Sequence, residues 1–174
     1  DNILVSVGIN DEYYFTNHSE RIDDGCYHNI QSVLDKTTLL VGHNIKFDLM
    51  WLIEAGFKYT GKVYDTMLGE YILNRGIRKS LTLEMSCRRR RIGSKDNRIK
   101  EFTDRGIPFQ NIPANVVEEY GRMDVQITRD LFNSQMADFK MPKNKHLLMT
   151  AKMMNEFLIV LSDMEANGIN INLE

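Results

Sequence analysis

Two residues in the segment NVVEEYGRMDVQITRDLF combine a reactive group with a helical spacing. Tyr120 and Asp124 are four residues apart, so in the helix that this segment predicts they share one face. That face continues through the apolar side chains of Val116, Val117, Ile127 and Leu131, which makes it the core-facing stripe. A carboxylate on such a stripe must be paired, hydrogen-bonded or bound to a metal, because an isolated buried charge is too costly.

A second aspartate has the same layout. In LLVGHNIKFDLMWLIEAG, the apolar run Leu39–Val41 leads into a predicted helix that stops at Gly56, with Asn44 as its N-cap. Asp48 lies one turn after Asn44, among apolar residues. Each of two helices therefore carries an aspartate on an apolar face with a polar or phenolic partner one turn earlier.

The elements that must position these residues alternate between strand and helix, which predicts a layered α/β domain. A hairpin is expected from Ile3–Ile9 and Tyr13–Thr16, and helices or strands are expected near residues 24–34, 39–41, 62–64 and 65–73. Asn115 and Glu118 suggest a capping box for the helix that carries Tyr120. Asp65 is expected to be a helix N-cap and not a metal ligand.

Residues 92–114 contain two glycines and two prolines and are expected to be an irregular connection. Beyond Pro142, another helix is predicted to run to Gly168. Its apolar residues recur at helical spacing, which indicates packing; these residues are Leu147, Met154, Phe157, Leu158, Leu161 and Met164. We expect this helix to contact a domain outside this chain.

The bulk properties are those of an ordinary globular protein of 174 residues with a net charge of −2, so any nucleic-acid-binding face must be local. Cys26 and Cys87 lie far apart and suggest no disulfide framework. No targeting or transmembrane segment is visible. The predicted helix Ser80–Cys87 ends in four arginines, Arg88, Arg89, Arg90 and Arg91, with Lys95 soon after. This run is either a solvated helix C-terminus or a patch that faces the phosphates of single-stranded DNA.

Three motifs in order, HNIKFD, VYDTMLGEYIL and YGRMD, resemble the 3′–5′ proofreading exonuclease domain of family A DNA polymerases. The resemblance covers residues 1–140 and implies a ribonuclease-H-like mixed sheet flanked by helices, in the tyrosine-bearing branch of the four-carboxylate exonucleases. Residues 141–174 resemble the linker helix and start of a polymerase domain. The style of the sequence is that of a phage enzyme.

That resemblance implies hydrolysis of the 3′ end of single-stranded DNA with two Mg²⁺ or Mn²⁺ ions. Asp124 would hold the metal that carries the attacking water, Asp48 would support the second metal, and the Tyr120 hydroxyl would orient the water. Asn44 and the four arginines are the expected nucleic-acid-binding residues. The implied partner is a polymerase domain of the same polypeptide. The implied location is the cytoplasm of a bacterial or phage-infected cell, and no membrane partner is expected.

One motif of the family is missing. An Asp-x-Glu pair should lie on the first strand, at the centre of the sheet. Asp11 and Glu12 are adjacent, and Asp163 and Glu165 fall on nearly opposite faces of a predicted helix, so neither pair can replace it. We therefore expect residues upstream of Asp1 in the natural protein, and little metal binding or cleavage by residues 1–174 alone. The alternatives are an inactive exonuclease fold that serves as a structural or DNA-binding module, a ribonuclease of the same superfamily, and an α/β domain whose aspartates are only hydrogen-bonded.

Overall fold

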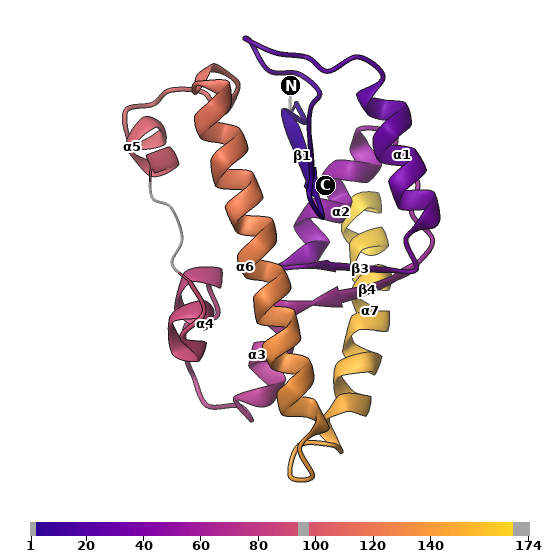
Figure 1. Cartoon of the computed structure of the whole chain (residues 1–174). Helices are drawn as coiled ribbons and strands as arrows, with labels where there is room; N and C mark the ends of the chain where they lie inside the picture. Colours follow the sequence, from indigo (N-terminus) through magenta and orange to yellow (C-terminus); the bar gives the residue numbers. More distant parts are fainter. Residues whose placement is uncertain (1–2, 94–97, 169–174) are drawn as a thin grey trace, which may run out of the picture.

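The computed structural model describes residues 3–93 and 98–168, which form helices around two small sheets (Figure 1). In chain order the elements are β1 (Ser6–Ile9), β2 (Glu12–Phe15), α1 (Cys26–Lys36), β3 (Leu39–Gly42), α2 (Ile45–Glu54), β4 (Lys62–Asp65), α3 (Thr66–Leu73), α4 (Leu83–Arg90), α5 (Arg98–Asp104), the 3₁₀ turn η1 (Phe109–Asn111), α6 (Ala114–Lys140) and α7 (Leu147–Asn167). The predicted α/β class is confirmed.

The expected hairpin is formed by β1 and β2. These strands pair antiparallel with Ile9 opposite Glu12, which leaves Asn10 and Asp11 as a two-residue turn. Asn10 has a φ of 55°, the left-handed conformation that tight hairpin turns favour and that asparagine tolerates.

A parallel pair, β3 and β4, makes the second sheet. Gly42 lies opposite Asp65, and α2 forms the crossover that parallel neighbours require. Within the described residues β1 pairs only with β2, and β3 only with β4. The expected mixed sheet is thus present as two separate halves, one antiparallel and one parallel.

The long helix α6 connects the two halves, and the long helix α7 packs on the parallel half. α6 contacts β1, β2 and β3, whereas α7 packs against α2, α3 and β4. Figure 1 shows α6 running along much of the length of the molecule. Leu131 and Val117 of α6 are fully buried, as the predicted apolar stripe requires. α1 contributes Ile30 and Leu34 to a cluster that includes Leu52 of α2.

The start of α6 differs from the prediction. The helix begins at Ala114, directly after Pro113, so Asn115 lies inside its first turn and does not cap it. Proline fixes the entry conformation and lacks the N–H that a first turn leaves unused. Glu118 forms ion pairs with Arg21 and Arg122, so the predicted capping box is wrong.

Two other boundaries also differ. The helix expected from Ser80 begins at Leu83, with the Thr82 hydroxyl accepting the Met85 N–H as its cap. The segment expected to be irregular contains α5 and η1. Lys95 and residues 169–174 lie outside the described residues. None of the described helices has the length and apolar character needed to cross a membrane.

Candidate functional site

A groove of about 640 Å³ lies between the two halves of the sheet. We call it the central groove. Its walls come from β1 and β3 and from the helices on either side: Ser6–Ile9, Leu39–Gly42, residues of α2 including Asp48 and Trp51, and residues of α6 including Asp124, Thr128 and Phe132. The groove is therefore bordered by the edge of each half-sheet that has no partner strand among the described residues.

Both predicted aspartates line the central groove. Asp48 comes from the first turn of α2, and Asp124 from the middle of α6. Tyr120 is one turn before Asp124, but it does not belong to the described lining; it is half-buried against the cluster formed by Phe15 and Val117. The structure thus brings the two carboxylates to one cavity and leaves the Tyr120 ring against the neighbouring core.

The pKa of Asp48 reflects the low solvation of its carboxyl and the negative charges near it. Its pKa is raised from 3.8 to about 6, chiefly because the groove walls displace water from around the carboxyl. The negative charges of Asp65 and Asp124 raise it further, and a backbone hydrogen bond partly opposes them. The Asp48 side chain keeps contact with solvent, so a group entering the groove can reach it.

Asp65 performs the predicted capping role. One oxygen of this buried carboxylate, Oδ1, accepts the N–H of Met67 at 2.8 Å, which caps α3, and the N–H of Asn44 at 2.9 Å. The Asp65 N–H donates to Oδ1 of Asn155 on α7 at 2.6 Å. Asp65 therefore joins the start of α2, the start of α3 and the middle of α7 behind the groove.

Asn44 occupies the predicted N-cap position of α2, but by a different contact. It has a φ of 62°, and its side chain makes no capping hydrogen bond; the backbone N–H to Asp65 holds the turn. The neighbouring His43, which the sequence did not single out, bridges Thr66 Oγ1 at 2.9 Å and the Leu81 carbonyl at 2.8 Å. The loop before Asp48 is thus fixed from both sides.

A glycine and a tyrosine fix the position of Asp124. Gly121 lies inside α6 next to the Tyr13 ring, and a Cβ at Gly121 would be 2.3 Å from Cε2 of that ring. The Tyr13 hydroxyl is hydrogen-bonded to Ser6 Oγ at 2.8 Å and donates to the Val117 carbonyl at 3.3 Å. The hairpin therefore packs closely on α6 one turn from Asp124. A glycine in the middle of a predicted helix was the sequence signal for this contact.

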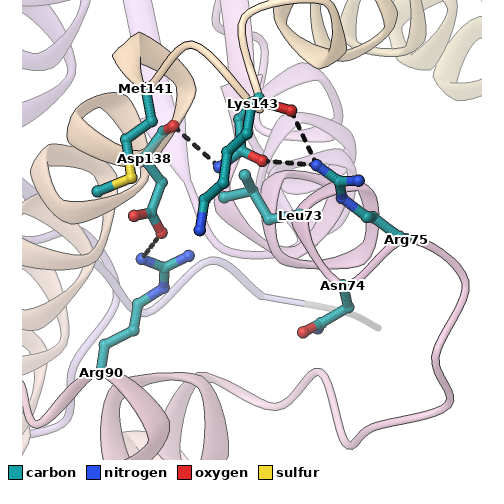
Figure 2. Close-up of a pocket in the computed structure, with 8 residues that line it drawn as sticks. Leu73, Asn74, Arg75, Arg90, Asp138, Met141 and Lys143 are labelled. Carbon is teal, nitrogen blue, oxygen red and sulfur yellow. Dashed lines mark hydrogen bonds and ion pairs between the residues drawn. The ribbon is translucent and has the colours of Figure 1, made fainter.

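Two of the four arginines in the run make ion pairs with a neighbouring helix. Arg89 and Arg90 both form ion pairs with Glu70 of α3, whose side chain is 3% exposed. Arg90 also donates to Asp138 of α6 at 2.7 Å, as Figure 2 shows. These two arginines connect α4 to α3 and α6, and their role in DNA binding stays a prediction. Arg88 and Arg91 are exposed and stay as predicted DNA-binding residues.

A second cavity of about 540 Å³ adjoins Arg90, next to the loop that joins α6 to α7. Figure 2 shows the Arg75 guanidinium turned toward this loop, where it donates to the Lys143 carbonyl and to Asn144 Oδ1, both at 2.9 Å. Neither Asp48 nor Asp124 belongs to its lining. This cavity is separate from the central groove.

The donor set of the central groove fits a hard divalent cation but is incomplete. Two carboxylates that repel one another provide the oxygen ligands that Mg²⁺ and Mn²⁺ prefer. Among residues 3–93 and 98–168, no group of three or more Asp, Glu, His or Cys side chains is arranged to hold a metal. Further ligands would have to enter the groove.

Comparison with known proteins agrees with the motifs. A family model for the 3′–5′ exonuclease of A-type DNA polymerases matches residues 3–137. DNA polymerase I of Borreliella burgdorferi is 26% identical over 143 residues, which make up 82% of this chain and 15% of that polymerase. The chain thus spans a small part of the relative's length. Because the family model matches well over half of the chain, through both groove aspartates, the chain belongs to the 3′–5′ exonuclease domain family of A-type DNA polymerases.

Proposed function

We propose that this chain is the proofreading domain of a DNA polymerase and that it removes nucleotides from the 3′ end of single-stranded DNA. The observation that carries the proposal is the meeting of Asp48 and Asp124 in one groove, although they lie on different helices and are far apart in sequence. Carboxylates in a groove, with their charges interacting, are suited to a metal-assisted phosphodiester hydrolysis.

Each residue has a role in this proposal. Asp124 and Asp48 would hold the cations, and the Tyr120 hydroxyl, which lies outside the described lining, would orient the attacking water. Bound Mg²⁺ or Mn²⁺ would supply Lewis-acid stabilisation of the charge that develops on the phosphate. Asn44, Arg88 and Arg91 lie at exposed positions from which they can contact the DNA backbone.

The remaining ligands are proposed to arrive on a β-strand that fills the central groove. β1 and β3 each present an edge without a partner strand in the described part of the chain, and both border the groove. A strand between them would satisfy backbone groups on both sides and join the half-sheets into one. Alternate residues of that strand would point to the same face, so an Asp-x-Glu pair on it would reach the aspartates together.

The test uses the natural full-length polypeptide and a single-stranded DNA labelled at its 5′ end. Asp124→Ala and Asp48→Ala should each lower Mg²⁺-dependent shortening by at least about 100-fold, because each loss costs several kcal/mol of transition-state stabilisation. Asp163→Ala is the matched control, since this exposed aspartate on α7 lies outside the central groove and should leave the rate unchanged. Equal rates for the wild type and Asp124→Ala would reject the proposal.

The same assay separates the two alternative functions. A ribonuclease of this superfamily would shorten RNA faster than DNA, whereas we expect the reverse. An inactive module would bind DNA with a salt-dependent affinity and shorten neither nucleic acid. Arg88→Ala and Arg91→Ala should weaken DNA binding and reduce its salt dependence if these two exposed arginines contact phosphates.

A further inference from the structure

Two loops whose formal charges are all positive meet at one end of the molecule. One loop follows α3 and the other joins α6 to α7, and Figure 1 shows both at the lower end. The Arg75 guanidinium ties the loops together, because it donates to the Lys143 carbonyl and to Asn144 Oδ1, both at 2.9 Å. We call six cations of these loops and of the adjoining end of α6 the basic end: Arg75, Arg78, Lys79, Lys140, Lys143 and Lys145.

The basic end contrasts with the charge of the whole chain. Residues 71–83 and 139–155 contain no Asp or Glu, although the chain has a net charge of −2. The remainder of the chain is therefore net negative. Positive charge gathered at one end of a molecule that is negative elsewhere attracts polyanions to that end.

The cations of the basic end are also available to an external anion. All six residues are exposed, and within residues 3–93 and 98–168 none of them forms an ion pair with a carboxylate. Arg90 differs, because it is held by Glu70 and Asp138. The basic end therefore keeps its charge for a partner, whereas Arg90 uses its charge inside the fold.

The cavity of about 540 Å³ described above lies within the basic end. Arg75 and Lys143 line it, and the one carboxylate of its described lining, Asp138, is bound by Arg90 at 2.7 Å. Figure 2 shows the Lys143 side chain reaching from its loop toward Arg90. The buried Asn144 fixes this loop, because its Nδ2 donates to the Asp138 carbonyl at 3.0 Å. The loop thus presents its cations beside a hollow with room for a phosphate group.

We propose that the basic end binds phosphates of DNA and forms a second DNA contact, separate from the central groove. The choice of DNA as the polyanion rests on the proposed function. Asp124 and Lys140 both belong to α6 and are about 24 Å apart at the rise of an α-helix. One strand of B-form DNA spans this distance in about seven nucleotides. The basic end would hold phosphates several nucleotides away from a 3′ end in the groove, without reading the bases.

The composition of the two loops favours phosphates over a protein surface. The centre of a protein interface is poor in charge and rich in aromatic residues. Residues 74–82 and 141–146 contain no Phe, Tyr or Trp, and their charges are all positive. Clustered Lys and Arg side chains are the groups that neutralise a nucleic-acid backbone. An acidic segment of another protein is the competing partner, and the test below distinguishes it.

Lysine acetylation in the natural full-length polypeptide tests the contact, with EDTA present so that no DNA is cleaved. The probe is a DNA hairpin of about 20 base pairs with a single-stranded 3′ end, long enough to reach both sites. Saturating DNA should slow the acetylation of Lys79, Lys143 and Lys145 at least about fivefold. The exposed lysines Lys36 and Lys58, at the end of α1 and after α2, should react at unchanged rates. Unchanged rates at the first three lysines would overturn the proposal.

The salt dependence of DNA binding gives an independent readout. The triple variant Lys79→Ala, Lys143→Ala and Lys145→Ala should make the slope of log affinity against log salt shallower by about two to three, because each lost phosphate contact removes about one. The matched double variant Lys36→Ala and Lys58→Ala should keep the wild-type slope. The same slope in all three proteins would reject the contact.

Two competitors identify the anion. Protection of the three lysines by poly-glutamate as strong as that by DNA would assign the basic end to an acidic protein and reject the proposal. Equal protection by inorganic phosphate, at the same phosphate concentration, would show a site for single anions and reject it too.

The acetylation readout requires no nuclease activity, so the two proposals can fail separately. An inactive nuclease whose three lysines are protected would reject the proposed function alone. An active nuclease whose three lysines are unprotected would reject the second DNA contact alone.

Discussion

Asp48 and Asp124 derive their proposed importance from where they meet and not from either residue alone. An aspartate on an apolar face is often structural, and Asp65, which is more deeply buried than either, is satisfied by two backbone N–H groups. Asp48 differs because its neighbours raise the energy of its charged form. A site that brings interacting carboxylates together is suited to a cation.

The pKa of Asp48 gives a prediction at the residue scale. With divalent cations removed, its carboxyl should titrate near pH 6, which carboxyl carbon NMR shifts can follow. Asp65→Asn and Asp124→Asn should each lower this pKa, Asp65→Asn more strongly, because the Asp65 charge is the larger of the two electrostatic causes.

This shift also sets the sign of a stability effect. Between about pH 4 and 6 the folded chain keeps a proton on Asp48 that the unfolded chain has lost, so the free energy of unfolding should fall as pH rises through this window. Asp124→Asn should flatten that slope. An Asp48 pKa near 4 in the wild type, unmoved by either substitution, would contradict the crowding that we describe.

At the scale of elements, α6 connects the site to the rest of the fold. It carries Asp124, receives the hairpin through Tyr13, and binds the hairpin turn through Arg129, which pairs with Asp11 at 3.0 Å. Arg122 also donates to the Asp11 carbonyl at 2.5 Å. These contacts set how close the hairpin half-sheet approaches Asp124.

Substitution of Gly121 tests that close approach. In an open helix, Gly→Ala stabilises by about 1 kcal/mol, because alanine is the better helix former. Here the added methyl meets the Tyr13 ring, so Gly121→Ala should instead destabilise by about 1–3 kcal/mol, the usual cost of overpacking. Urea unfolding measures the difference. In a double-mutant cycle, Tyr13→Ala should remove most of the penalty; a more stable Gly121→Ala single mutant would show that the helix and hairpin can separate at no cost.

A second prediction at the scale of elements concerns the contribution of Arg90 to the free energy of unfolding. Arg90→Ala leaves the buried Glu70 carboxylate with one arginine fewer and should lower the free energy of unfolding by about 3–5 kcal/mol. Arg88→Ala, at an exposed position on the same helix, is the control and should change it by less than about 0.5 kcal/mol. Similar values for the two variants would mean that Arg90 is not part of the structural network.

At the scale of the molecule, the two half-sheets and the central groove are the main feature. α6 connects the halves and α7 packs on the parallel half, yet β1 and β3 do not pair with each other. The described residues therefore form the walls of a groove that holds two carboxylates, and the proposed strand would complete both the sheet and the proposed ligand set.

Hydrogen exchange of the strand amides tests this view. In the natural full-length polypeptide, the groove-side amides of β1 and β3 should exchange about as slowly as the amides that β1 shares with β2, because a central strand protects both edges. In residues 1–174 alone, the same amides should exchange faster than those within the β1–β2 pairs. Equal protection in the two proteins would indicate that no strand enters the groove.

The sequence by itself predicted most of the elements and proposed the site residues. Strand and helix patterns located the hairpin, the β3–α2–β4 unit and the Asp65 cap, because these depend on contacts between residues near one another in the chain. Three short motifs were enough to indicate the family, which the comparison confirmed.

Only the tertiary structure decided how distant residues are used. It assigned Arg89 and Arg90 to Glu70, placed the Tyr120 ring against the core beside the groove, and replaced the Asn115 cap with an entry from Pro113. It also showed which face of α7 is buried. Local periodicity marks a face as apolar, but which surface covers that face depends on packing between elements, and one helix carries no information about its partner.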